Sequence, residues 1–169
     1  MSKILIAFFS RAGENYFGGV LRRIETGNTE IAAKIIADLT GGKLFKIVPA
    51  VSYSKNYAAC IEEAKKDLQC RARPKLISLP ENLDAYDEIY LGYPNYWGTM
   101  PMAVYTFLEA FDFTGKTIHP FCTHEGSGLA RTEKDVAETA KGARVTKGLA
   151  IKGSAVKDAE QQIKEWCRK

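Results

Sequence analysis

Short apolar runs alternate along this chain with longer stretches in which apolar residues recur every three or four positions. Brief, uniformly apolar runs are typical of strands buried on both faces, and longer periodic stretches are typical of amphipathic helices. The runs predict five strands, at residues 3–9, 43–48, 87–93, 117–122 and 144–151. Because strands and helices alternate, the pattern predicts a parallel sheet that is covered by helices on both faces.

Five helices are predicted around these strands. The first spans residues 28–40, with Ile31, Ile35 and Leu39 on one side and Gly41 as its stop signal. The apolar side of the second helix is formed by Tyr57, Ile61, Ala64 and Leu68. The side chains predicted to cap the second to fifth helices are Ser54, Thr99 (with Pro101 in the first turn), Thr132 with Asp135, and Ser154.

Three features fit this scheme less simply. Residues 14–25 are rich in glycine and mixed in polarity, which predicts a surface loop inserted into the first strand–helix connection. Residues 76–79 predict a short extended piece. Pro120 lies inside the fourth predicted strand, although a proline cannot donate a hydrogen bond to a ladder.

The connection between the first strand and the first helix carries hydroxyl groups and glycine. Ser10 ends the strand, and Thr26-Gly27-Asn28-Thr29 opens the helix. Free backbone N–H groups, hydroxyl donors and the helix dipole together favour a bound anion at such a place. An ordinary strand–helix turn with a capped helix explains the same residues, so this segment alone leaves both interpretations open.

Two further loops follow strand ends. In residues 92–101, Tyr96 and Trp97 are adjacent between Pro94 and Gly98, and a flat apolar ligand would explain two aromatic rings at a loop tip. The alternative is that the rings fold back into a core or a subunit interface. Residues 123–128 offer hydrogen-bonding groups near the same place, or form a solvent-exposed turn. All three loops leave carboxyl ends of strands, where parallel α/β sheets bind their ligands.

Composition narrows the class of protein. A length of 169 residues with 46% hydrophobic residues suits a single domain, residues 1–169. The apolar runs are too short to span a membrane, and the beginning of the chain lacks the features of a signal peptide, so a cytoplasmic location is expected. The four cysteines form no CxxC pair, which argues against a disulfide framework or a thiolate metal site.

The charge distribution and the motifs of the chain argue against nucleic-acid binding, a metal site and serine hydrolase activity. The net charge is +4, and the basic residues are scattered without interleaved aromatic residues, which argues against nucleic-acid binding. Cys122 and His124 lie two positions apart, but two residues do not make a metal site. The chain has no G-x-S-x-G segment of the kind that serine hydrolases use. We therefore expect neither a catalytic side chain nor a metal ligand.

Taken together, the three loops resemble those of the flavodoxin family, and the resemblance covers nearly the whole chain. Residues 8–13 followed by 26–29 look like the family's phosphate loop, split by the insert at residues 14–25. Residues 94–98 look like its first flavin loop, and residues 126–128 look like part of its second. Each match alone is weak, whereas all three in order at three strand ends are specific.

The resemblance implies a flavodoxin-like, doubly wound five-stranded parallel sheet of order 2-1-3-4-5 and a non-covalently bound FMN. Arg11 would offset the phosphate charge or point to solvent. The residues implied around the phosphate are Ser10, Arg11, Ala12, Gly27, Asn28 and Thr29. Those implied around the ring are Pro94, Asn95, Tyr96, Trp97, Gly98, Thr123, His124, Glu125, Gly126, Ser127 and Gly128.

Three functions follow from the resemblance. The first is a carrier of electrons between redox partners, which the small size and single domain favour. The second is an FMN-dependent oxidoreductase that takes hydride from NAD(P)H and reduces a quinone-type acceptor. The mildly basic charge favours this second function, because the family's electron carriers are usually strongly acidic. The third, a binding module without FMN, disagrees with the intact loops. The expected partner is a redox protein or a small-molecule electron acceptor, with no nucleic acid and no membrane span.

Overall fold

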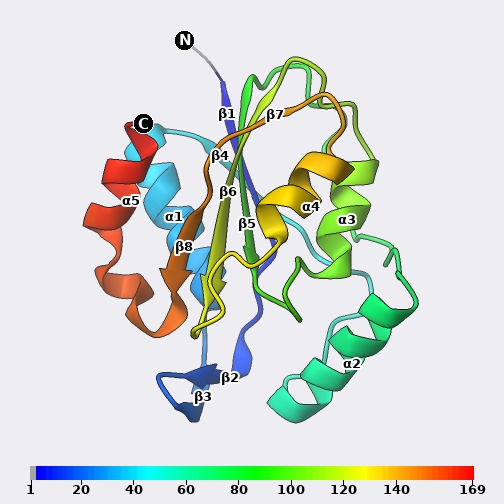
Figure 1. The fold of residues 1–169 in the computed structure, drawn as a ribbon, viewed down its shortest axis with the longest axis vertical. Helices are drawn as coiled ribbons and strands as arrows, with labels where there is room; N and C mark the ends of the chain where they lie inside the picture. The colour runs from blue at the N-terminus through cyan, green and yellow to red at the C-terminus, as the bar shows by residue number, and fades with distance from the viewer. Residues whose placement is uncertain (1–2) are drawn as a thin grey trace.

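A computed structural model describes residues 3–169, and its centre is a mostly parallel sheet between two layers of helices (Figure 1). The strands lie in the order β4-β1-β5-β6-β7, and β8 also pairs with β6. The predicted order 2-1-3-4-5 is therefore confirmed, with the fifth strand divided into two pieces. The bounds of these strands are Ile4–Phe8 (β1), Lys43–Lys46 (β4), Glu88–Pro94 (β5), Thr117–His124 (β6), Arg144–Val145 (β7) and Leu149–Lys152 (β8).

Pro120 explains why the last strand is divided. The N–H of Thr146 still donates to Ile118 O at 3.0 Å, which continues the ladder between β7 and β6. The next residue of β6 that could donate across this ladder is Pro120, which has no N–H. The N–H of Gly148 instead donates to the carboxylate of Glu133, and pairing resumes at Phe121 with Leu149.

The helices cover the two faces of the sheet (Figure 1). One face carries α1 (Asn28–Thr40), the 3₁₀ helix η1 (Gly153–Asp158) and α5 (Glu160–Cys167), and the other carries α3 (Met102–Glu109) and α4 (Thr132–Thr139). Helix α2 (Tyr57–Gln69) stands apart from the sheet, below α3. No helix within residues 3–169 combines the length and the apolarity that a membrane crossing requires.

Strand β1 shows how the two cores arise from one alternating strand. Leu5 and Ala7 belong to the core under α3 and α4, whereas Ile6 and Phe8 belong to the core under α1 and α5. All four side chains are buried, because successive residues of a strand point to opposite faces and both faces are covered.

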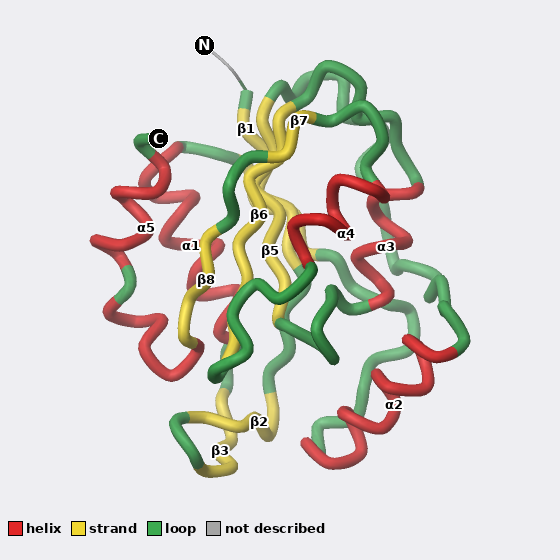
Figure 2. The backbone as a smooth tube through the Cα atoms, viewed as in Figure 1, coloured by secondary structure: helices red, strands yellow, loops and turns green. Residues whose placement is uncertain are grey.

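The insert is not the irregular loop that the sequence predicted. Residues 13–24 form an antiparallel hairpin of β2 (Gly13–Phe17) and β3 (Val20–Ile24), below the main sheet in Figure 2. Gly18 and Gly19 form its turn with φ values of 63° and 96°, which a two-residue hairpin turn of this hand requires. The Gly-Gly pair between two short β-prone runs was the signal that the prediction missed.

Several predicted caps are wrong, although the first helix begins and ends as predicted. Helix α2 is capped by Asn56, not Ser54, because the helix begins two residues later than that cap would require. Helices α3, α4 and α5 have no side-chain cap: Thr99 and Asp135 bond to each other, Thr132 donates to Leu129 O, and Ser154 lies within η1. The extended piece at 76–79 appears as an isolated bridge of Leu76 with Pro49.

Candidate functional site

A cleft of about 440 Å³ lies among the loops that leave the carboxyl ends of β1, β5 and β6. The structure brings most of the predicted site residues together here. Those that line the cleft are Arg11, Asn28, Thr29, Pro94, Asn95, Tyr96, Trp97, Thr123, His124, Glu125, Gly126 and Ser127. The predicted residues that do not line it are Ser10, Ala12, Gly27, Gly98 and Gly128.

The N-terminus of α1 opens into this cleft and has unused hydrogen-bond donors. Gly27, at the N-cap position, makes no side-chain cap, and the hydroxyl of Ser10 accepts a hydrogen bond from Glu30 N at 3.0 Å. Within the described chain, the N–H groups of Asn28 and Thr29 have no partner. Two free donors at the positive end of a helix suit an anion.

Two close approaches shape this end of the cleft. A Cβ on Gly27 would collide with the Ser10 hydroxyl and lie 2.8 Å from Arg11 O, so the first loop can fold against the helix only at a glycine. Thr29 and Thr123 are both buried, and their hydroxyl groups are 2.7 Å apart. The threonine pair therefore joins the helix start to the end of β6 directly beneath the cleft.

The Arg11 side chain does not extend freely into solvent, because hydrogen bonds to the backbone hold its guanidinium. Its guanidinium donates to Ser54 O at 2.8 and 3.0 Å and to Glu14 O at 2.6 Å. Carbonyl oxygens leave its positive charge uncompensated, so the charge still acts on any anion in the cleft. Arg11 thus joins the first loop, the hairpin and the segment before α2.

Asn95 holds the two loops that flank the middle of the cleft. Its Nδ2 donates to Gly128 O at 2.9 Å, its Oδ1 accepts from Gly98 N at 2.9 Å, and its own N–H donates to Thr123 O at 2.9 Å. Both loops are therefore fixed relative to each other before any ligand binds. One N–H of this amide and one lone pair of its oxygen are left for a ligand.

Trp97 is a surface residue and not part of a core. It is 48% exposed, and its indole N–H donates to Ile61 O on α2 at 2.9 Å. Its backbone has φ of 56° and the following Gly98 has φ of 84°, so the peptide between them lies in a conformation that glycine permits. The interpretation that Trp97 fills the core is wrong.

Sequence reasoning missed one complete wall of the cleft. Tyr57, Cys60, Ile61 and Ala64, spaced as one face of a helix, line it from α2. The other residues that the prediction missed are Asn15 and Tyr16 from the hairpin and Gly153. The apolar stripe of α2 was visible in the sequence, but apolar periodicity alone does not predict whether such a stripe packs on a sheet or lines a cleft.

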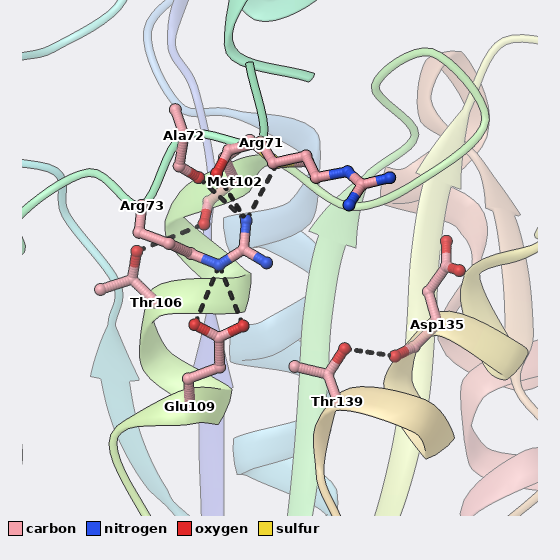
Figure 3. Close-up of polar contacts among 8 residues, drawn as sticks. All are labelled: Arg71, Ala72, Arg73, Met102, Thr106, Glu109, Asp135 and Thr139. Carbon is pink, nitrogen blue, oxygen red and sulfur yellow. Dashed lines mark hydrogen bonds and ion pairs between the residues drawn. The ribbon is translucent and has the colours of Figure 1, made fainter. Parts of the chain in front are cut away.

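Helix α2 is held at both ends although it stands apart from the sheet. At its start, Tyr57 N donates to Glu14 Oε1 of the hairpin at 3.0 Å. Beyond its end, Arg73 donates to both carboxylate oxygens of Glu109 on α3 (Figure 3). Its guanidinium also lies 4.8 Å from the centre of the Tyr105 ring. These ties fix the α2 wall relative to the loops.

The α2 side of the cleft carries no charge on its hydroxyl and thiol groups at neutral pH. Burial raises the pKa of Tyr96 well above its usual value, and burial also raises the pKa values of Tyr57 and Cys60, against an opposing effect of Arg11. Neutral groups around an apolar wall suit an uncharged, flat ligand.

The opposite side of the cleft is polar. His124 Nδ1 accepts from Gly126 N at 2.9 Å, so the neutral ring carries its proton on Nε2. Burial lowers the pKa of His124, which favours that neutral form at physiological pH. Residues 3–169 contain no group of three potential metal ligands close enough to hold an ion.

Comparison with known proteins agrees with this geometry. A flavodoxin family model matches residues 3–169. A flavoprotein structure from Bacteroides uniformis ATCC 8492 is 30% identical, with a TM-score of 0.77 over 99% of both chains. One from Bacteroides eggerthii DSM 20697 is 28% identical, with a TM-score of 0.71 over 96% of this chain and 98% of that one.

A third similar structure is a flavoprotein in complex with FMN from Lactobacillus acidophilus NCFM. It is 20% identical, with a TM-score of 0.65 over 94% of this chain and 98% of that one, and so shows a shared fold. No curated protein sequence matches this chain.

Proposed function

The chain belongs to the flavodoxin family, and from that premise we propose that it binds FMN and carries electrons between redox partners. FMN takes up and releases electrons, and the protein supplies its binding and its electrostatic surroundings. The similar Lactobacillus acidophilus protein is in complex with FMN. The cytoplasm is the proposed location, since the four cysteines are free thiols, and such thiols persist in a reducing compartment.

The observation that carries the proposal is the open N-terminus of α1 at one end of a cleft with an apolar wall. The free N–H groups of Asn28 and Thr29 suit a phosphate, and the lack of a side chain at Gly27 lets the loop of Ser10 and Arg11 pack directly against this helix start. Arg11 also lines the cleft, and its positive charge adds attraction for an anionic group. The residues present therefore fit a flavin phosphate.

The remaining loops suit the ring of the cofactor. Residues 94–98 and 123–128 flank the middle of the cleft, and Asn95 holds them together. We assign the ring to the space between these loops, with Trp97 covering part of it and α2 excluding water from one side. A neutral, low-dielectric surround disfavours added negative charge on a bound ring, which lowers its reduction potential.

Titration of the apoprotein with flavins tests the proposal. FMN is expected to bind with a changed visible spectrum, and riboflavin, which lacks the phosphate, is expected to bind at least about tenfold more weakly, because a charge-assisted hydrogen bond contributes about 1.5–3 kcal/mol. Equal affinities for the two would show that no phosphate site exists at α1. Failure of both to bind would overturn the proposed function itself.

A second function, an FMN-dependent NAD(P)H:quinone-type oxidoreductase, is favoured by one specific observation. Tyr16 and Trp97 on either side of the α2 wall are 43% and 48% exposed, so aromatic surface remains open beside the proposed ring position. A second flat molecule could bind against such a surface. Steady-state oxidation of NAD(P)H in the presence of a quinone separates the functions, because a pure carrier would show none.

A further inference from the structure

Arg11 is a half-buried cation that keeps two hydrogen-bond donors free within residues 3–169. Its guanidinium has five N–H groups, and three of them donate to the backbone oxygens of Ser54 and Glu14. One N–H on each terminal nitrogen therefore remains for a ligand. Arg11 forms no ion pair within the same range, and the Glu14 carboxylate, the nearest along the chain, accepts from Tyr57 N instead.

The guanidinium of Arg11 lies beside the α2 wall of the cleft. Both of its acceptors belong to segments that meet the beginning of α2. Its positive charge also counteracts the rise in pKa that burial causes in three groups that line the cleft, Tyr57, Cys60 and Tyr96. At the start of α1, by contrast, it is the main chain of Arg11 and not its guanidinium that a Cβ on Gly27 would meet. The charge is therefore directed toward α2 and the loop of Tyr96.

The surroundings of Arg11 in the cleft carry little other charge. Among the described residues that line the cleft, Arg11 and Glu125 carry a full charge when His124 is neutral. The Glu125 carboxylate accepts hydrogen bonds from Gly18 N, Ser154 N and the Ser154 hydroxyl, at 2.7–3.2 Å, so donors from the hairpin and η1 compensate it. Arg11 instead borders buried neutral groups. A charge acts strongly there, because the effective dielectric constant is low.

We propose that Arg11 stabilises the negative charge that the flavin ring gains on reduction, and that it is not a ligand of the phosphate. This role rests on the proposed function, with the ring between residues 94–98 and 123–128 and the phosphate at the start of α1. Uptake of two electrons and one proton leaves one negative charge on the ring. The charge of Arg11 acts on Tyr96, in the first of these loops, and on Cys60 of α2. Arg11 therefore favours the reduced cofactor and raises its reduction potential, against the effect of the neutral wall.

Anaerobic titration of the apoprotein with oxidised FMN and with dithionite-reduced FMN tests this role. Arg11→Gln is expected to weaken the binding of reduced FMN at least about tenfold more than that of oxidised FMN, which lowers the two-electron potential of bound FMN by at least about 30 mV. Arg11→Lys keeps the charge and should retain most of the native ratio of the two affinities. Lys55→Gln is the matched control: Lys55 is exposed and does not line the cleft, so solvent screens its charge and the ratio should change less than about twofold.

Riboflavin, which lacks the phosphate, separates an effect on the ring from an effect on the phosphate. Arg11→Gln should change the ratio of reduced to oxidised affinity as much for riboflavin as for FMN, and Arg11→Met, a second neutral variant, should repeat the result. A loss shared equally by oxidised and reduced FMN would overturn the role of Arg11 and leave the proposed function intact. A ratio as low in Arg11→Lys as in Arg11→Gln would do the same. A native chain that binds neither form of FMN overturns both.

Discussion

Helices α1 and α2 have the same length of 13 residues, and both begin near the carboxyl edge of the sheet, yet they do different work. The face of α1 that is fully buried against the sheet includes Ala32, Ala33 and Ile36, whereas the predicted side, Ile31, Ile35 and Leu39, is only partly buried. The stripe of α2 lines the cleft instead. Similar amphipathic patterns thus serve one helix as core and the other as the wall of a binding site.

The two helix N-termini differ in how many of their first N–H groups have hydrogen-bond partners. On α2, Glu14 accepts from Tyr57 N and the N-cap residue Asn56 accepts from Ala59 N. On α1, only Glu30 N is capped, by Ser10, and the first two N–H groups remain available. Both dipoles favour an anion, but among the described residues α1 leaves two adjacent N–H groups without a partner, at Asn28 and Thr29, whereas α2 leaves one, at Ala58. The number of free donors, more than the dipole, distinguishes the start of α1 as the better candidate for an anion site.

The largest expected effect comes from truncating each stripe in turn. Ile36→Ala leaves a cavity in the core under α1 and is expected to lower the free energy of unfolding by about 2–5 kcal/mol, with little specific effect on FMN affinity. Ile61→Ala on α2 is expected to weaken FMN binding with little loss in the free energy of unfolding, because that side chain lines the cleft and is only partly buried. Denaturant unfolding of the apoprotein and FMN titration measure both quantities. Equal losses of stability in the two variants would erase the distinction between the helices.

Trp97→Ala tests the loop whose tryptophan donates a hydrogen bond to Ile61 O on α2. FMN affinity is expected to fall more than tenfold, since stacking of an aromatic ring contributes about 1–3 kcal/mol, while stability changes little because Trp97 is largely exposed. The control is Trp166→Ala on α5, whose ring packs against the core under α1 and should affect stability instead. A Trp97 variant that loses stability but keeps its FMN affinity would contradict this role.

Removal of one cap from each helix is expected to have a smaller effect. Asn56→Ala and Ser10→Ala each remove one acceptor from a helix N-terminus and should cost about 1 kcal/mol of stability. Only Ser10→Ala is expected also to change FMN affinity, because it alters the α1 end of the cleft. Thermal unfolding with and without FMN separates the effect on stability from the effect on FMN affinity. An equal change in FMN affinity for both variants would contradict a phosphate site at α1.

Arg73→Ala is expected to have the smallest effect. The ion pair of Arg73 with Glu109 is exposed, and such pairs contribute about 0–1 kcal/mol (Figure 3). Its loss should loosen the end of α2 without changing α1, which hydrogen exchange in the two helices can detect. Glu138→Ala, in an exposed pair with Lys134 on α4, is the control that should leave α2 unchanged.

Much of the fold was predictable because local patterns specify it. Apolar runs, some of them interrupted by polar residues, placed the strands of the main sheet, and the span from Asn28 to Gly41 marked the first helix at both ends. The three loops with unusual composition meet at one cleft, because parallel strands deliver their carboxyl ends to one edge. The caps predicted at Ser54, Thr99, Thr132 and Ser154 were wrong. Helix α2 begins after Asn56, and the hydroxyl groups of Thr99, Thr132 and Ser154 bond instead to Asp135, Leu129 O and Glu125.

The α2 wall and the hydrogen bond from Gly18 N to Glu125 could not be predicted in the same way, whereas the hairpin carried a local Gly-Gly signal that the prediction missed. Periodicity reports that Tyr57, Cys60, Ile61 and Ala64 share a face, but not what that face meets. Glu125 and Gly18 are separated by 107 positions, and no local propensity specifies such a hydrogen bond. The sequence determined which segments are strands and helices through short-range sterics and apolar periodicity. Only the tertiary structure decided which apolar face lines the cleft and which donors stay free, because both depend on contacts between distant segments.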